Sequence, residues 1–203
     1  MKNIVVLLML LSMIVFAQLQ GSFTDFRDGK VYRITKIGKQ TWMAENLNYD
    51  TTGSQYHSDK YGRLYDWETA MKICPSGWHL PNNEEWAALI KFSGGKKAGR
   101  KLKAVSGWND DSETHSSGNG TDDYGFAALP GGRGYKDRPL TSIVIGEESR
   151  WWSATKCPVK SPAKQCPSDD YASYWYINHY SDRVGDYTSE TIIKLYSVRC
   201  LKN

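Results

Sequence analysis

The alternation of apolar and polar residues predicts strands near both ends of the chain. Residues 31–37 alternate with the period of a half-buried strand, and residues 40–43 return after a Gly-Lys turn, which predicts a hairpin. Residues 46–61 are polar and are predicted to form a loop. Three later runs are rich in aromatic and β-branched residues and also predict strands: 150–155, 171–179 and 192–201.

Helical spacing of apolar residues is confined to the first half of the chain. Residues 65–73 predict a short helix, and the basic run 96–105 predicts another. The clearest helix begins after Asn82, because Glu85 follows three residues later as in a capping box, and a Gly-Gly pair ends it. Residues 106–121 are polar and glycine-rich, which predicts a long surface loop.

The order of these elements predicts the fold class. A hairpin, two or three helices, long loops and then strands indicate an α+β fold, with short helices in the first half packed on small antiparallel sheets. The chain has 203 residues, the length of one domain, and no linker marks a second domain. We therefore expect a single domain over residues 18–203.

The N-terminal segment has the pattern of a signal peptide. Lys2 precedes an almost wholly apolar run over residues 4–16, and a Val-Phe-Ala sequence then fits the small-x-small cleavage rule. The run is shorter than the roughly 20 residues that span a bilayer. We expect residues 1–17 to be a cleaved signal peptide, the protein to be secreted or on the cell surface, and no membrane span to remain after cleavage.

Composition and charge narrow the function classes. Eight Trp and 13 Tyr accompany only five Phe, so most of the aromatic surface carries a polar group and suits binding surfaces. The net charge of +4 is spread along the chain, whereas a nucleic-acid binder concentrates basic charge on one face, so we expect no nucleic-acid partner. The chain lacks a Gly-x-Ser-x-Gly sequence, and its four His show no nucleophile–base arrangement, so no catalytic residue is predicted.

Four cysteines in an exported chain predict disulfides, and four cysteines allow three pairings. Cys157 and Cys166 share one proline-rich loop, which favours a local bridge and leaves Cys74 to pair with Cys200. A zinc site or a catalytic thiol is the alternative. The chain has no Cys-x-x-Cys sequence and no His at zinc-ligand spacing from a Cys pair, so disulfides are favoured.

Acidic and amide side chains gather in and after the predicted long loop. Calcium prefers several oxygen ligands from flexible, acidic, glycine-containing loops, so this stretch is a candidate calcium site, although its spacing is not that of an EF-hand. The alternative is a turn network, in which these side chains accept hydrogen bonds from nearby backbone amides. The candidate ligands are Asp110, Asp111, Asn119, Asp122 and Asp123.

Aromatic residues crowd the predicted strand 171–179. In a strand, Tyr174 and Tyr176 face one side and Trp175 faces the other. One of these faces, with Trp151 of the preceding predicted strand, is a candidate site for stacking on sugar rings or for anchoring a protein partner. The alternative is that both faces pack inside the domain.

Several short sequence motifs occur in order through nearly the whole chain after residue 17. They are GKQTWMAENLNY (38–49), GRLYDW (62–67), CPSGWHLP (74–81), GTDDYGFAALPGG (120–132), WWSAT (151–155) and SVRC (197–200). In these motifs the chain resembles the Fibrobacter succinogenes major paralogous domain family. That family is similar to C-type-lectin-like folds, including the distantly similar formylglycine-generating sulfatase-modifying enzymes.

The resemblance implies a C-type-lectin-like fold. Such domains tie a helix to the last strand, which supports the pairing of Cys74 with Cys200. The segment from Cys157 to Cys166 departs from the family pattern and resembles a local insertion. The sulfatase-modifying enzymes need reactive cysteines near the C-terminus, and Cys200 is the only cysteine there, so an oxidase role is disfavoured.

These observations together predict an exported, non-catalytic binding or adhesion module. It is expected to recognise a polysaccharide or a cell-surface protein through its loops and exposed aromatic residues. One alternative is an enzyme related to the sulfatase-modifying factors, which needs a redox-active thiol. The other is a structural cell-surface component that self-associates. Calcium is the cofactor that the sequence favours, if the protein holds one.

Overall fold

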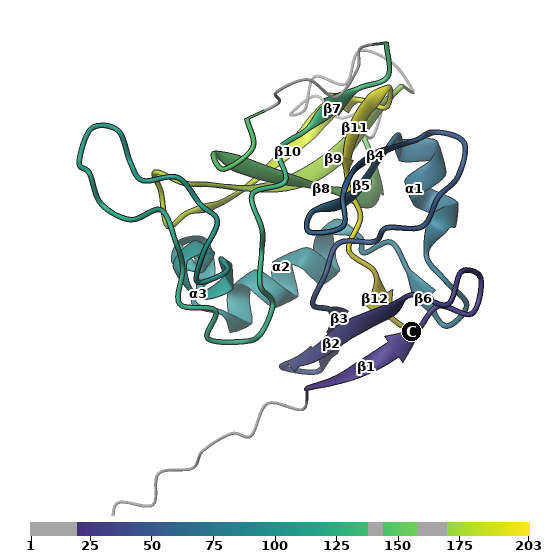
Figure 1. Cartoon of the computed structure of the whole chain (residues 1–203), viewed down its shortest axis with the longest axis horizontal. Helices are drawn as coiled ribbons and strands as arrows, with labels where there is room; N and C mark the ends of the chain where they lie inside the picture. The colour runs from purple at the N-terminus through teal and green to yellow at the C-terminus, as the bar shows by residue number, and fades with distance from the viewer. Residues whose placement is uncertain (1–19, 138–143, 158–169) are drawn as a thin grey trace, which may run out of the picture.

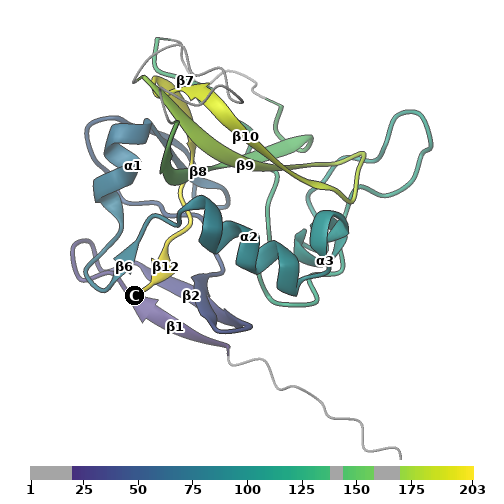
Figure 2. The same cartoon turned by 180° about the vertical axis from the view of Figure 1, so that it is seen from behind.

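The computed structural model describes residues 20–137, 144–157 and 170–203 (Figure 1). The predicted signal peptide and Cys166 lie outside these residues. The described chain forms two β-sheets with short helices beside them (Figures 1 and 2). In this part of the chain, no helix is long and apolar enough to cross a membrane.

The smaller sheet contains the predicted hairpin. Its strands in spatial order are β1 (Gln20–Thr24), β2 (Val31–Ile37), β3 (Gln40–Met43), β12 (Leu201–Lys202) and β6 (Trp78–His79). β2 pairs with β3 in antiparallel register, with Ile34 opposite Met43, which confirms the hairpin. The C-terminal strand β12 therefore sits inside the sheet that the N-terminal hairpin begins.

The larger sheet collects strands from the middle and the end of the chain. Its path runs through β10 (Val184–Thr191), β9 (Tyr171–Asn178), β8 (Glu148–Lys156), β11 (Lys194–Ser197), β5 (Gly62–Tyr65) and β4 (Ser54–Ser58), with β7 (Gly134–Tyr135) paired to β11. β11 runs parallel to β8 and antiparallel to β5. From β11 the chain passes through residues 198–200 into β12, so this short segment links the two sheets (Figure 1).

The described helices are short. They are α1 (Trp67–Ile73), α2 (Asn83–Phe92), the 3-10 turn η1 (Gly95–Lys97) and α3 (Gly99–Leu102). Side chains cap the N-termini of two of them, α1 and α2. Asn82 Oδ1 accepts a hydrogen bond from the backbone N of Glu85 at 2.9 Å, and Glu85 Oε2 accepts one from the backbone N of Asn82 at 2.9 Å. This is the predicted capping box, and it satisfies two backbone donors at the start of α2.

The expectation of an α+β fold is wrong, although the described helices do lie in the first half of the chain. Strands dominate the described residues, and the two sheets make a sandwich-like fold whose helices are short. β4 lies inside the predicted loop 46–61, and β10 lies where no strand was predicted. Backbone pairing supplies the hydrogen bonds of both strands, and polar side chains on an exposed face do not prevent it. Residues 106–121 form no helix or strand, as predicted for a loop.

Two clusters of buried side chains lie on opposite faces of the larger sheet. Because side chains alternate along a strand, Trp152 and Tyr174 belong to one cluster, whereas Trp151 and Trp175 belong to the other. Side chains of α1 pack in the first cluster, and side chains of α2 pack in the second. In the second cluster, Trp86 of α2 stacks on Trp175 with ring centroids 6.2 Å apart. Much of the unusual aromatic content is therefore core, which stabilises the fold by removing apolar area from water.

A disulfide joins the end of α1 to the segment that links the two sheets. Cys74, the C-cap of α1, is bonded to Cys200 in the link between the sheets, 126 residues later in the sequence. This confirms the predicted pairing. The backbone N of Met43 donates to the carbonyl oxygen of Cys200 at 3.0 Å, which fixes the same segment to β3. The bridge between Cys157 and Cys166 stays a prediction, because Cys166 lies outside the described residues.

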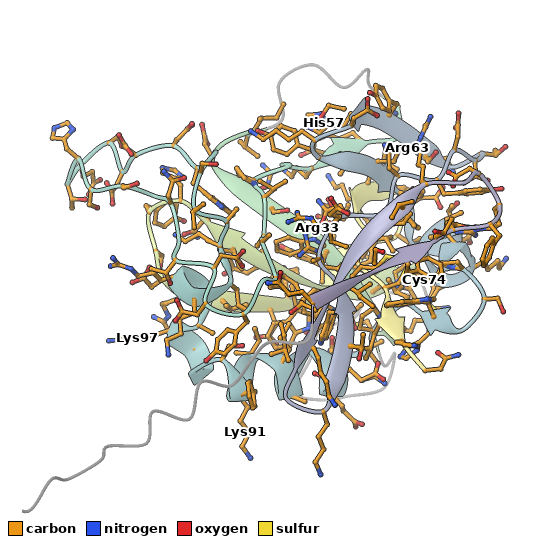
Figure 3. The ribbon with its side chains drawn as sticks, turned by 60° about the horizontal axis from the view of Figure 1, so that its bottom comes forward. Arg33, His57, Arg63, Cys74, Lys91 and Lys97 are labelled. Atoms are coloured by element: carbon orange, nitrogen blue, oxygen red, sulfur yellow. A yellow bond between two sulfur atoms is a disulfide. The ribbon has the colours of Figure 1, made fainter. Side chains whose placement is uncertain are left out.

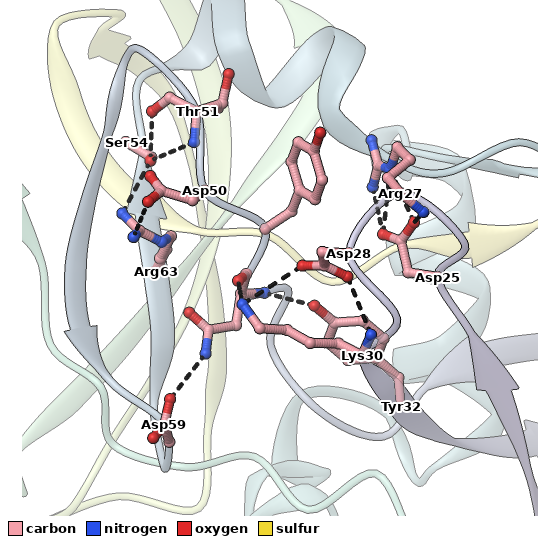
Figure 4. Close-up of polar contacts among 12 residues, drawn as sticks. Asp25, Arg27, Asp28, Lys30, Tyr32, Asp50, Thr51, Ser54, Asp59 and Arg63 are labelled. Carbon is pink, nitrogen blue, oxygen red and sulfur yellow. Dashed lines mark hydrogen bonds and ion pairs between the residues drawn. The ribbon is translucent and has the colours of Figure 1, made fainter.

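An ion pair fixes the loop between β1 and β2. Arg27 Nη2 lies 2.6 Å from Asp25 Oδ2 (Figure 4). Arg27 Nη1 also donates to the carbonyl oxygen of Ile73, at the end of α1, at 2.8 Å. Burial would raise the pKa of Asp25, but hydrogen bonds and positive charge from Arg27 outweigh burial and hold that pKa below its ordinary value. The loop is therefore tied to α1 by a charge-assisted contact.

Candidate functional site

The four predicted ligand-binding aromatic residues are divided between core and surface. Trp151 is 1% exposed, Trp175 is 8% exposed and Tyr174 is 6% exposed, whereas Tyr176 is half-buried. Tyr174 and Tyr176 share one face of β9, with ring centroids 6.0 Å apart, and Trp175 lies on the opposite face. Of this set, Tyr176 has the ring that reaches solvent.

Trp151 belongs to a buried polar cluster rather than to a surface. Asn46 Oδ1 accepts hydrogen bonds from Trp151 Nε1 at 2.9 Å and from Arg199 Nη2 at 3.0 Å, and Asn46 Nδ2 donates to the carbonyl oxygen of Tyr61 at 3.0 Å. The Arg199 guanidinium lies 4.2 Å from the ring centre of Phe126 and also donates to the carbonyl oxygen of that residue. Burial lowers the pKa of Arg199 to about 9, so it is charged at neutral pH.

This cluster brings together sequence motifs that lie far apart in the chain. Its members come from the motifs at 38–49, 120–132, 151–155 and 197–200, which the fold brings to one buried point. Asn46 accepts from both Trp151 and Arg199, so residues from three of these motifs bond directly to one another. These motif residues therefore stabilise the buried part of the fold.

Two of the candidate calcium ligands accept hydrogen bonds from backbone amides nearby in the sequence. Asp111 Oδ1 accepts from the backbone N of Thr114 at 3.1 Å, and Asp122 Oδ1 accepts from the backbone N of Ala127 at 2.7 Å. The backbone hydrogen bond from Thr114 lowers the pKa of Asp111, whereas burial raises the pKa of Asp122. Among the described residues, no group of three or more His, Cys, Asp or Glu side chains is placed to hold a metal ion. All five candidate ligands lie within the described residues: Asp110, Asp111, Asn119, Asp122 and Asp123.

The strongest candidate site lies on the Tyr174 side of the larger sheet. β8, β9 and β10 are adjacent there, with Arg150 opposite Tyr176 and Tyr187 opposite Tyr174. Tyr196 of β11 completes the group, with its ring centre 4.9 Å from that of Tyr174. We call this surface the tyrosine–arginine face, and its members are Glu148, Arg150, Tyr174, Tyr176, Tyr187, Glu190 and Tyr196.

Arg150 is the centre of the tyrosine–arginine face. Its Nη1 donates hydrogen bonds to the phenol oxygens of Tyr174 and Tyr196, each at 3.1 Å. Its Nε lies 3.0 Å from Glu148 Oε1, and Tyr196 OH donates to Glu190 Oε2 at 2.8 Å. Charged and phenolic groups therefore form one connected network that holds the rings in place.

Burial and charge set the protonation states of this face. Burial raises the pKa of Tyr174 to about 12 and also raises the pKa of Tyr196 above its ordinary value. Burial would lower the pKa of Arg150, but the neighbouring oxygens of Tyr196 and Glu148 raise it above its ordinary value. At neutral pH the face therefore presents neutral phenols beside a permanent positive charge.

The outer rim of the face is aromatic and accessible. Tyr187 is 51% exposed, and its ring centre lies 5.5 Å from that of Tyr174. Gly185 faces Tyr176 across the strands, and a Cβ atom there would lie 2.2 Å from Tyr176 Cζ. The Tyr176 ring therefore occupies the space above a glycine, and a larger residue at that position would displace it.

The arrangement suits binding better than acid–base chemistry. Glu148 Oε1 and Glu190 Oε2 lie 3.0 and 3.8 Å from nitrogen atoms of the same guanidinium, so both carboxylates hold Arg150. The sequence pattern identified Tyr174 and Tyr176 but missed the arginine and Tyr187. Local sequence could not reveal these two residues, because they join the face only when β8 pairs with β9 and β9 pairs with β10.

Comparison with known proteins agrees with the resemblance seen in the sequence. Residues 35–202 match the family described as the Fibrobacter succinogenes major domain. The matched range begins in β2 and ends in β12, so it contains the buried cluster of Asn46, Trp151 and Arg199 as well as the tyrosine–arginine face. No curated protein and no solved structure matches the chain. The chain belongs to the Fibrobacter succinogenes major domain family.

Proposed function

We propose that the protein is an exported, non-catalytic binding module that recognises a polysaccharide through the tyrosine–arginine face. One observation carries the proposal. The half-buried Tyr176 and the exposed Tyr187 border solvent beside a partly buried network of arginine, glutamate and tyrosine. A rigid polar network beside exposed rings is what a binding site for a ring-shaped, hydroxylated ligand requires.

The chemistry of a sugar ring matches this face. A pyranose has apolar C–H faces and hydroxyl groups at its edge, so aromatic rings stack on its faces while phenol, guanidinium and carboxylate groups bind its hydroxyls. Tyr176 and Tyr187 each supply a ring and a phenol. The hydrogen bond from Arg150 to Tyr174 OH holds the ring between them, which lowers the entropic cost of binding.

Two further observations support export and disfavour the enzyme alternative. The disulfide between Cys74 and Cys200 is typical of an oxidising compartment, which agrees with the signal peptide predicted at residues 1–17. A sulfatase-modifying activity needs a redox-active thiol near the C-terminus. Cys200 is fully buried and held in that disulfide, so it offers no such thiol.

The test is retention of the purified mature protein on insoluble cellulose, xylan, chitin and isolated cell walls, with calcium and with a chelator. We expect saturable retention on one polymer. The variant Tyr176→Ala/Tyr187→Ala should bind at least about tenfold more weakly, because each aromatic contact contributes about 1 kcal/mol. Tyr180→Ala, which removes a tyrosine that is 63% exposed beyond the same strand, should bind like the wild type.

Each other outcome has a defined meaning. Unchanged retention of the double variant would show that the tyrosine–arginine face is not the site. Loss of retention with chelator would instead point to the loop between Asp110 and Asp123. Retention on no polymer would overturn the polysaccharide proposal. Self-association in that case would favour a structural cell-surface component, and capture by an isolated surface protein would favour a protein partner.

A further inference from the structure

Although the net charge was expected to be spread along the chain, positive charge is concentrated at one end of the molecule. Between Glu85 and Asp110 the chain contains six basic residues and no acidic residue. Five of the six are exposed, and the β2–β3 hairpin, which carries two further exposed lysines, contacts the end of α2 through Gly38. We call this surface the basic end, and its members are Lys36, Lys39, Lys91, Lys96, Lys97, Arg100 and Lys101.

The fold brings two distant segments together at the basic end. α2, η1 and α3 follow one another with short turns, and Lys101 Nζ returns to 3.8 Å from the position of a Cβ atom on Gly94. A Cβ atom on Gly38, in the hairpin turn, would lie 3.0 Å from the ring of Phe92. The hairpin therefore touches the end of α2. Figure 3 shows Lys91 and Lys97 directed away from the ribbon.

The seven charges of the basic end have no ion-pair partner among the described residues. Elsewhere cations are paired, since Arg27, Lys30 and Arg63 each contact an aspartate (Figure 4). The fold thus uses basic side chains in ion pairs at several places but not here. Unpaired like charges on one surface repel one another and cost stability, so they are available for a partner.

Local structure accounts for little of this charge. Lys91 lies in the last turn of α2, where a positive charge interacts favourably with the helix dipole. Two aspartates lie at the rim: the backbone N of Asp123 donates to the carbonyl oxygen of Lys101 at 2.9 Å, and the backbone N of Gly99 donates to that of Asp182 at 2.8 Å. The seven bases outnumber these neighbouring acids, so the surface is positive.

We infer that the basic end binds an acidic polysaccharide, a sugar chain with an anionic group on most of its residues. Phe92 is 56% exposed among the cations, with Tyr124 packed edge-on at 5.8 Å between ring centres, and it offers a ring for a sugar to stack on. Six of the seven cations are lysines, which act as point charges and accept varied spacing of anions, whereas nucleic-acid sites favour the arginine fork. A membrane-bound helix presents several apolar residues, but α2 exposes one large one.

This surface is independent of the tyrosine–arginine face. α2 and α3 cover the Trp175 side of the larger sheet, whereas Tyr174 and Tyr176 lie on its other side. The two sites can therefore be removed separately. Failure of one proposal leaves the other standing, because each has its own variants and its own polymer.

The experiment measures binding to soluble polygalacturonate at 50 and 500 mM NaCl, with methyl-esterified polygalacturonate as the uncharged probe. We expect binding to the acidic polymer alone, weakened at least about tenfold by the added salt because ions screen exposed charges. The variant Lys96→Gln/Lys97→Gln/Arg100→Gln should bind at least about tenfold more weakly. Tyr176→Ala should not change this binding.

A matched variant removes the same charge elsewhere. Lys60→Gln/Lys72→Gln/Lys156→Gln takes three exposed lysines from other elements and lowers the net charge equally. It should bind polygalacturonate within about twofold of the wild type. Equal losses in the two triple variants would overturn the proposal, because only net charge would then matter.

Two further binding measurements distinguish an acidic polysaccharide from other polyanions. Double-stranded DNA and vesicles with anionic phospholipid carry dense phosphate and are tested at the same salt. Weaker binding to both than to polygalacturonate supports the proposal. Tighter binding to DNA or to vesicles would overturn it and identify a nucleic-acid or a membrane surface. Equal binding of the methyl-esterified polymer would also overturn it, because the anionic groups would then play no part.

Discussion

The disulfide between Cys74 and Cys200 offers a quantitative test of how this fold is stabilised. Removing it with Cys74→Ala/Cys200→Ala frees a loop of 126 residues in the unfolded chain. The loop-entropy relation gives about 16 cal/mol/K for that length, or about 5 kcal/mol at 25 °C. For a chain of this size each kcal/mol shifts Tm by about 2–4 °C, so we expect a fall of about 10–20 °C.

The assay is urea unfolding of the wild type and the variant under identical conditions. If the disulfide acts on the unfolded state, the variant should lose about 5 kcal/mol and should also show a larger m-value, because its unfolded chain expands and exposes more surface. Val198→Ala provides the control. It removes two methyl groups from a fully buried neighbour of Cys200, so it should lower the unfolding free energy by about 1–3 kcal/mol without raising m.

Two results would refute this reasoning. A loss below about 2 kcal/mol would mean that the closed loop contributes little, so that residual structure already restricts the unfolded chain. A full loss with an unchanged m-value would mean that the effect lies in native packing around the buried Cys200. Either result would show that the entropy of loop closure does not explain how this disulfide stabilises the protein.

Three other predictions follow from specific contacts. Arg27 holds the pKa of Asp25 below its ordinary value, so in acid the unfolded state binds more protons than the folded state. The wild type should therefore lose its stability advantage over Asp25→Asn as the pH falls below about 4, as measured by urea unfolding. Asn46→Leu should cost about 3 kcal/mol or more in the same assay, because it leaves a buried indole and a buried guanidinium without their acceptor. Gly185→Ala should displace the Tyr176 ring and weaken polysaccharide retention while far-UV circular dichroism stays that of the wild type.

Local patterns predicted those elements whose signals are local. The capping box of Asn82 and Glu85 and the alternation over residues 31–37 depend on neighbours within a few positions, so the start of α2 and the first hairpin were predicted correctly. The strands β4 and β10 were missed, because polar strands owe their existence to pairing with distant strands. The predicted α+β class failed for the same reason.

The candidate site was predicted in part. Alternation placed Tyr174 and Tyr176 on one side of a strand, but it did not reveal which rings the core would cover. Trp151 and Trp175 went to the core because both faces of the larger sheet are packed, one by α1 and the other by α2. The calcium site in the acidic loop stays a prediction, and Asp111 there accepts a hydrogen bond from the backbone N of Thr114.

The sequence by itself determined the family, the helix caps and the residues available for binding. The pairing of Cys74 with Cys200 was one of three possibilities until the fold placed the end of α1 beside the link between the sheets. Only the tertiary structure assembled Arg150 and Tyr187 into one surface and brought the β2–β3 hairpin to the end of α2. The physical reason is that side-chain chemistry is local, whereas a binding surface depends on strand pairing and packing between residues far apart in the chain.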